Sequence, residues 1–556
     1  MKAKLRMDPW KLITIGVILL YAIFLLYPVG KLLLQAFVDK TSGDITFNYF
    51  IKFFSQSYYF DTLMNSFKVS LCATALALAV GTPLAYLFTM YRVKGKKVLQ
   101  VLIIIASMSA PFIGAYAWIL LLGRNGVITN FFNQTVGFQT PDIYGFGGIL
   151  LVFTLQLFPL VFLYVQGALR NVDNSLIEAS ENMGCTGAKR FFKVIIPLIM
   201  PMLLAAMLLV FMRALADFGT PMLIGEGYRT FPVLIFTEFL GEVSGDDGFA
   251  AAIAIIAVLI TTIVFLVQKW VANRKSFSMN SLHPIEEKNF QNKRTSIVSY
   301  IFCYGVVGLA ILPQAYVIYT SFLNTRGKIF VEGYSFESYR TAFSRLGNSI
   351  QNTILIPGIA LVLIILLAVL ISYLTVRRKN PATGTIDVIS MVPYIIPGTV
   401  LGIALLTAFN TGIMGSGILA IGGTIGIMIV ALVIRRLPYT IRSSTATLQQ
   451  IPMSIEEAAL SLGCSKMKTF FKITVPMMAN GIIAGAILSW VTMISELSTA
   501  VLLYTVKTQT LTVSIYQQVV RGNYGVAAAL AAILTTLTVI SLLIFMKISK
   551  SDNVTI

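Results

Sequence analysis

The sequence predicts an all-α polytopic membrane protein made of two tandem units with six transmembrane helices each. Hydrophobic residues make up 57% of the 556 residues and charged residues 12%, about half the charged share of a soluble domain. The mean hydropathy is +0.82. In addition, the stretch Ser175–Pro197 returns without a gap as Ser454–Pro476, at an offset of 454 − 175 = 279, about half of the chain. The chain is therefore predicted to be a duplicated membrane unit.

Twelve apolar runs are long enough to cross about 30 Å of hydrocarbon, which takes about 20 helical residues. The first six lie near 12–37, 63–90, 98–122, 146–168, 194–224 and 249–271. The second six lie near 297–322, 350–376, 386–409, 417–434, 473–503 and 526–546. Because each half has an even number, both halves have the same orientation and a pseudo-two-fold axis along the membrane normal relates them. We expect a first repeat over 1–272, a cytosolic linker over 273–295 and a second repeat over 296–556.

The distribution of positive charge predicts the orientation. The formal net charge is +19, and Lys and Arg crowd the short loops at 92–97 and 377–379 as well as both repeated stretches. Such loops are retained in the cytosol, so we expect both termini, the linker and both repeated stretches there. The excess of positive charge suits anionic lipid. Nucleic acid is not expected as a partner, since no basic run is interleaved with aromatic residues for base stacking.

Each copy of the repeated stretch predicts a short helix. The Ser-x-x-Glu patterns at 175–178 and 454–457 are typical of a capping box, in which the Ser oxygen accepts a backbone N–H and the Glu carboxylate reaches back. Gly184 and Gly463 suit the left-handed backbone that ends a helix. A helix of about two turns is expected in each copy. The glutamates could act as helix caps alone, or also take part in docking.

The repeated stretches resemble a known motif. Glu178-Ala179-Ser180-x3-Gly184 and Glu457-Ala458-Ala459-x3-Gly463, each followed by nine residues and an aliphatic-x-aliphatic-Pro ending, resemble the EAA motif of ABC-importer permeases. Ser180 stands where that family has Ala. The resemblance implies the type I importer fold. It also implies that an ATPase docks on the motif residues, namely Glu178, Ala179, Gly184, Glu457, Ala458 and Gly463.

The same resemblance implies partners and a location. Two copies of a separate cytosolic ATPase would bind ATP and magnesium, and an extracytoplasmic solute-binding protein would deliver the substrate. The protein would lie in the plasma membrane of a bacterium.

The segments 391–398 and 448–452 resemble those of ferric-iron-type fused permeases, which implies ferric iron as the substrate. Importers of 2-aminoethylphosphonate, thiamine, polyamine or sulfate-type solutes share the architecture and remain alternatives.

The chain itself is not expected to be an enzyme. It has no GxxxxGK[ST] phosphate loop, one histidine and four scattered cysteines, so neither ATP hydrolysis nor a cofactor or metal site is predicted in it. A secondary transporter is a remote alternative. It would need buried ion-coupling carboxylates and has no use for two matched cytosolic helices. A membrane-embedded enzyme is disfavoured because no catalytic residues cluster.

Acidic residues within the apolar runs are candidates for the transport path, since a charge in a spanning helix costs roughly 2.5–3.5 kcal/mol by insertion scales. Asp217 and Glu496 are counterparts at the same offset, 496 − 217 = 279. Arg213 lies one turn before Asp217 and could neutralise it, whereas Glu496 has Thr492 at that place and lacks a local partner. Alternatively, the two acids face each other and favour a cationic solute. Further candidates, or simple packing residues, are Ser495, Ser498 and Thr499.

Overall fold

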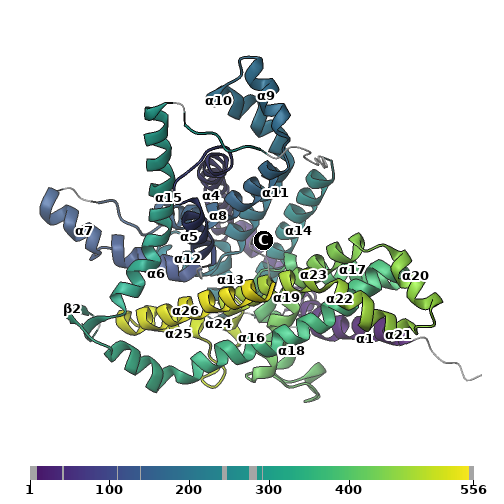
Figure 1. Cartoon of the computed structure of the whole chain (residues 1–556). Helices are drawn as coiled ribbons and strands as arrows, with labels where there is room; N and C mark the ends of the chain where they lie inside the picture. The colour runs from purple at the N-terminus through teal and green to yellow at the C-terminus, as the bar shows by residue number, and fades with distance from the viewer. Residues whose placement is uncertain are drawn as a thin grey trace, which may run out of the picture.

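The computed structural model describes residues 9–39, 43–108, 111–137, 140–240, 247–274, 285–290, 292–327 and 329–549, and Figure 1 shows their arrangement. The first repeat contains α1 (Pro9–Tyr21), η1 (Ala22–Leu26), α2 (Tyr27–Gln35), α3 (Asn48–Ser55), α4 (Ser57–Met90), α5 (Lys96–Met108), α6 (Pro111–Leu122), α7 (Val127–Phe131), η2 (Phe132–Val136), α8 (Phe146–Arg170), α9 (Asn174–Asn182), α10 (Gly187–Arg190), η3 (Phe191–Ile195), α11 (Ile196–Ala216), α12 (Gly219–Ile224), α13 (Phe231–Leu240) and α14 (Asp247–Arg274).

The second repeat follows the same order. It contains α15 (Lys293–Thr320), β1 (Leu323–Arg326), β2 (Ile329–Tyr334), α16 (Glu337–Arg377), α17 (Pro381–Ile395), α18 (Gly398–Phe409), η4 (Ile413–Gly415), α19 (Ile425–Gln450), α20 (Met453–Ser461), α21 (Lys466–Thr469), η5 (Phe470–Thr474), α22 (Val475–Met477), α23 (Ala479–Ile494), α24 (Ala500–Leu503), α25 (Leu511–Val520) and α26 (Tyr524–Ser549). The all-α class is confirmed, and the strands of the described ranges form one antiparallel hairpin.

Most of the predicted spans are present as long apolar helices. Within the described residues, nine helices are long and apolar enough to cross a membrane, or eleven if each of two bent pairs counts as one span. The predicted run 386–409 is such a pair, because α17 and α18 meet at 109°. Pro397 precedes α18 and Ile396 is extended, as a residue before proline prefers. The predicted run 473–503 is bent by 67° between Lys466–Met477 and α23.

Three predicted runs need correction. The run 98–122 is two helices, α5 and α6. The run 194–224 ends as a helix at Ala216, and α12 is separate. The run 417–434 corresponds to α19, which begins later and extends to Gln450. α19 carries three arginines and so lacks the composition of a lipid-facing span. It packs instead against α16 and α23, and these protein surroundings accommodate the three arginines.

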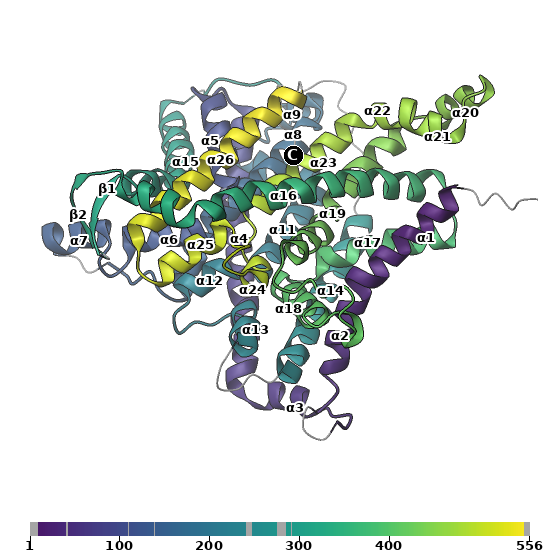
Figure 2. The ribbon, with the colours of Figure 1, turned by 90° about the horizontal axis from the view of Figure 1, so that it is seen from below.

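The two repeats exchange their first helices. α1 packs on α16 and α17, and α2 packs on α18, all in the second repeat. Conversely, α15 packs on α4, α5, α6 and α8 of the first repeat, as Figures 1 and 2 show. The larger hydrophobic core combines residues of both repeats. Trp10 and Tyr21 belong to the core that contains the second repeat, whereas Cys303 and Val307 belong to the core around α4 and α8. Neither repeat therefore has a complete core of its own.

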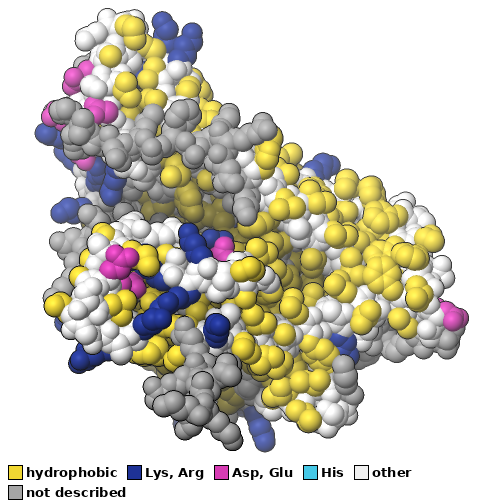
Figure 3. Space-filling model, turned by 90° about the vertical axis from the view of Figure 1, so that its right-hand side faces the viewer, with side chains coloured by type: hydrophobic (Ala, Val, Ile, Leu, Met, Phe, Trp, Pro, Cys, Tyr) yellow, Lys and Arg dark blue, Asp and Glu magenta, His cyan; other side chains and the backbone are white. Residues whose placement is uncertain are grey.

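The surface has the character of a lipid-facing protein. Figure 3 shows a face whose right-hand part is mainly hydrophobic, while most of the charged side chains lie toward its upper and left-hand parts. Large exposed aliphatic side chains cover α15 and α16, for example Ile301 at 69% and Leu366 at 58%. An apolar helix face of this kind is stable only in contact with hydrocarbon or protein.

Candidate functional site

The two repeated stretches form matching short helices that end as predicted. α9 and α20 have nine residues each, which is about two turns. Gly184 and Gly463 follow them with φ of +74° and +87°, so the predicted left-handed glycines are confirmed. The amide of Cys185 donates to the carbonyl of Ser180 at 2.8 Å, and Cys464 repeats this contact with Ala459 at 3.0 Å. These bonds are those of a Schellman ending.

The predicted capping boxes are absent from both helices. In α9 the helix cap is Asp173, whose Oδ1 accepts from the amide of Ser175 at 2.9 Å. A carboxylate just before the helix is as good a cap as a hydroxyl, so the helix begins earlier than the Ser-x-x-Glu pattern indicates. In α20, Pro452 occupies the cap position and no side chain caps the helix.

The motif residues themselves are on the outside of the structure. Glu178, Ala179, Glu457 and Ala458 are exposed, and Glu178 accepts a hydrogen bond from the Asn174 amide at 2.7 Å. Their role in docking stays a prediction. The helix ends are more exposed still. Met183 and Leu462 are counterparts at the offset of 279 and are 78% and 87% exposed.

The first motif helix is held by the linker and by a tyrosine of α4. Lys288 lies in the linker and its Nζ donates to Glu181 Oε2 at 2.7 Å. Glu181 also pairs with Arg190, whose Nη2 donates to the hydroxyl of Tyr86 at 3.1 Å. The backbone of Lys288 bonds to Met90, the last residue of α4, and to Arg92 just after it. The linker thus fixes α9 against the loop that follows α4.

The second motif helix is held by a different set of residues. Glu456, buried in α20, accepts from Arg377 Nε at 2.9 Å and from the hydroxyl of Tyr373 at 3.2 Å. Tyr373 is the counterpart of Tyr86, at an offset of 373 − 86 = 287. The ring of Trp10, from the first repeat, lies 4.5 Å from that of Tyr373 and 5.1 Å from that of Phe470. Equivalent tyrosines therefore contact both motif loops, through an arginine in one and a glutamate in the other.

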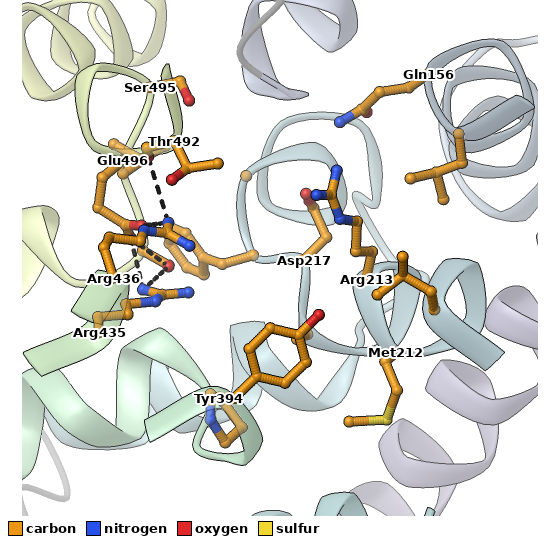
Figure 4. Close-up of a pocket in the computed structure, with 18 of the residues that line it drawn as sticks. Gln156, Met212, Arg213, Asp217, Tyr394, Arg435, Arg436, Thr492, Ser495 and Glu496 are labelled. Carbon is orange, nitrogen blue, oxygen red and sulfur yellow. Dashed lines mark hydrogen bonds and ion pairs between the residues drawn. The ribbon is translucent and has the colours of Figure 1, made fainter. Parts of the chain in front are cut away.

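A cavity of about 260 Å³ lies between the repeats. Both repeats line it, and Figure 4 shows its polar side chains. Those with polar groups are Ser107, Gln156, Arg213, Asp217, Tyr394, Arg435, Arg436, Tyr439, Thr492, Ser495, Glu496 and Ser498. The predicted path residues Asp217, Ser495, Glu496 and Ser498 are therefore among them. Thr499 is buried behind the wall, where its hydroxyl donates to the carbonyl of Gly398 at 3.1 Å.

Both candidate acids lie at breaks in helices. α11 ends at Ala216, and the carboxylate of Asp217 accepts from the amide of Thr220 at 2.9 Å. Glu496 lies in the corresponding break between α23 and α24. The carboxylate of Asp217 is thus turned toward the amide of Thr220, and within the described part of the chain it forms no ion pair with Arg213. The expected ion pair between Arg213 and Asp217 is therefore wrong, because the Asp217 carboxylate caps the backbone at Thr220 instead.

Glu496 has partners, and the two charged ones, Arg435 and Arg436, come from another helix, α19. Its Oε1 accepts from Arg435 Nη1 at 2.6 Å and from Ser498 Oγ at 2.8 Å, and its Oε2 pairs with Arg436. The Glu496 side chain is 4% exposed. The spacing of residues around Glu496 could not reveal the two arginines, of which Arg436 lies 496 − 436 = 60 residues earlier. The sequence contains a signal for this network in the two adjacent arginines that directly follow the apolar run 417–434.

The comparison of the repeats shows where the cavity is asymmetric. α8 and α19 begin at Phe146 and Ile425, again 279 apart. Gln156 and Leu157 therefore correspond to Arg435 and Arg436, while Arg213 corresponds to Thr492. Each repeat contributes one acid, but the arginines are on different helices in the two repeats.

A family model described as the inner membrane component of binding-protein-dependent transport systems matches residues 77–277 and 360–551, once in each repeat and over more than half of the chain. The chain belongs to this family. The permease is 28% identical to a ferric transport system permease protein of Actinobacillus pleuropneumoniae, over 98% of this chain and 79% of the relative. It is 24% identical to an Fe(3+)-transport system permease protein of Haemophilus influenzae, over 88% of this chain and 90% of the relative.

A shorter relative matches one repeat. The spermidine/putrescine transport system permease protein of Haemophilus influenzae is 26% identical over 47% of this permease and 94% of its own length. All three relatives are named as permease proteins of transport systems. The family and the apolar helices together identify this permease as a multi-pass protein of the inner membrane, made of two tandem permease units.

Proposed function

We propose that this permease is the membrane subunit of an ATP-driven ABC importer for ferric iron. Two copies of a separate ATPase dock on α9 and α20 in the cytosol, and an extracytoplasmic solute-binding protein delivers the substrate. The duplicated motif helices are the observation that carries the proposal, because two equivalent cytosolic surfaces suit a partner with two equivalent subunits. Both termini and the linker lie on the same cytosolic side.

The exposed ends of the motif helices support docking. Met183 and Leu462 occupy equivalent positions and leave most of their side chains uncovered. An exposed apolar side chain on an otherwise polar tip is typical of a partner contact. The short connections from α8 to α9 and from α19 to α20 transmit movement of the motif helices to helices that line the cavity. ATP binding and hydrolysis would thereby alternate the access to the cavity.

The proposal of iron rests on two relatives named for ferric transport, which this permease matches over most of its length. The test is uptake of radiolabelled ferric iron in cells that lack the chain and in cells complemented with it. Gly463→Pro is the loss-of-function variant, since a left-handed φ is closed to proline. Gly305→Ala is the matched control, because Gly305 has ordinary φ and open space around it. Rescue by wild type and Gly305→Ala alone is expected. Unchanged uptake on deletion would exclude iron.

A second experiment tests the docking surface by itself. Leu462→Asp places a charge on the tip of α20 and is expected to abolish co-purification of the ATPase. Val506→Asp is the control, because Val506 is exposed to the same degree, 86%, and lies on the predicted extracytoplasmic side. If the ATPase is retained by Leu462→Asp, α20 is not its docking site. If both variants lose it, the effect is not specific to the motif.

A further inference from the structure

The charges that line the central cavity do not suit a bare cation. Three arginines and two carboxylates line it, namely Arg213, Arg435, Arg436, Asp217 and Glu496. With ordinary ionisation this leaves one positive charge in excess. The carboxylate of Glu496 already accepts from both arginines of α19 and from Ser498. Its charge is consequently compensated within the protein and is not available to a solute.

Among the described residues, Arg213 is the cavity arginine that forms no ion pair, whereas Arg435 and Arg436 both pair with Glu496. Arg213 lies in α11, is exposed, and lines the cavity. Within the described residues it forms no ion pair and no hydrogen bond. Figure 4 shows Arg213 with Asp217 across the cavity from the network of Glu496, Arg435 and Arg436. A charged side chain in a spanning helix is energetically costly, and it is found where it pairs with another group or lines a water-filled path.

The cavity contains further donors near these arginines. Arg436 Nε has no hydrogen-bond partner in the described part of the chain. Gln156 of the first repeat extends toward the cavity, and so do Tyr394 and Thr492 of the second repeat (Figure 4). The planar guanidinium matches the geometry of phosphate and carboxylate oxygens. Pores selective for anions and phosphate are lined by arginine and lysine in the same way.

We propose that this cavity binds an oxyanionic group, with Arg213 as its main contact. This deepens the proposed function and rests on it in one respect: if iron is the substrate, ferric iron passes as a complex whose oxyanion ligand contacts Arg213. The volume of about 260 Å³ is slightly below the roughly 300–1,000 Å³ of drug-sized pockets, and suits a small anion or a compact complex. The excess positive charge opposes the cationic alternatives, thiamine and polyamine.

The test is equilibrium binding of radiolabelled inorganic phosphate to the full chain in lipid nanodiscs. Saturable binding is expected, at least tenfold weaker in Arg213→Gln and intermediate in Arg213→Lys, which keeps the charge but not the planar guanidinium. Arg345→Gln is the control, because Arg345 is an exposed arginine of α16 outside the cavity, and its binding is expected to equal that of wild type. Absence of phosphate binding in wild type, or equal binding in wild type and Arg213→Gln, overturns the proposal.

Two further arms separate this proposal from the proposal of iron. Ferric citrate is added as a competitor of phosphate, and iron uptake is measured in the same variants. Competition by ferric citrate, with uptake reduced in Arg213→Gln, supports an oxyanion that travels on iron. Phosphate binding without iron uptake by wild type excludes iron and leaves a site for a free oxyanion. Iron uptake that is intact in Arg213→Gln, without phosphate binding, excludes the oxyanion site and leaves the iron importer.

Discussion

Glu496 shows how one side chain can hold the wall of the cavity together. It joins α19 to the break after α23, through two arginines and a serine. The side chains of Arg435 and Arg436 are 15% and 12% exposed, so they depend on this carboxylate for charge compensation. A buried pair gives little net stability over an apolar core, but removal of one partner leaves uncompensated charge.

Glu496→Gln is therefore expected to destabilise the permease by about 3–5 kcal/mol, seen as a lower midpoint of thermal unfolding in detergent. Asp217→Asn is the matched variant at the other helix break. Because Asp217 forms no ion pair with any described residue, its replacement by Asn is expected to shift the midpoint much less. Equal shifts in the two variants would mean that the arginines do not depend on Glu496.

At the scale of elements, the two motif helices are anchored by unlike contacts. α9 is held from the linker through Glu181, and α20 through Glu456 and the ring of Trp10. The hydrogen bond from Lys288 is the main cause that lowers the pKa of Glu181, while burial acts in the opposite direction. A carboxyl with a lowered folded-state pKa stabilises the fold above its unfolded value of about 4.3, and this contribution is lost as the pH falls further.

Glu181→Gln should therefore lower the thermal unfolding midpoint near neutral pH and have a diminishing effect as the pH falls below about 4. The measurement is the difference in midpoint between wild type and variant across the pH range. A difference that does not change with pH would show that the charge of Glu181 is not what fixes α9. Because both Glu181 and Lys288 are partly exposed, the effect is expected to be small.

Trp10→Ala tests the anchor of the other helix. Trp10 is 3% exposed, and loss of a buried tryptophan costs about 3–5 kcal/mol. Hydrogen exchange is expected to rise in α20 and α21 more than in α9, since only the former adjoin the ring through Tyr373 and Phe470. Trp270→Ala is the control, because Trp270 is 57% exposed. Equal exchange in both motif loops would contradict the assignment of Trp10 to the second one.

These elements also show what could be predicted from the sequence. Apolar length alone located most of the spanning helices, and glycine chemistry located the ends of α9 and α20. The apolar run 417–434 did not predict the bounds of α19. Its apolar composition ends at Arg435, whereas the helix continues to Gln450 because protein, and not lipid, surrounds it. The partners of Glu496 could not be found from spacing along one helix, since they are about 60 residues away (496 − 436) and depend on packing between helices.

At the scale of the whole molecule, duplication produced a symmetric framework with an asymmetric interior. The stretch from the start of α8 to Asp217 in the first repeat corresponds to the stretch from the start of α19 to Glu496 in the second, at a constant offset of 279. Within that framework the arginines of the cavity moved to different helices. A fused chain permits such divergence, because each repeat occupies only one of the two positions, whereas identical subunits would have to change together.

The exchange of first helices makes a prediction about the halves. Each core contains a helix of the other repeat, so a half expressed alone would expose a large apolar surface to the lipid or detergent. Cutting the chain in the predicted linker between Met279 and Asn280 should give fragments that aggregate separately and co-purify when expressed together. Deletion of residues 9–35 from the first fragment should abolish co-purification, because α1 and α2 pack on the second repeat. Two fragments that are each monodisperse alone, by size-exclusion chromatography, would show that the exchanged helices do not complete the cores.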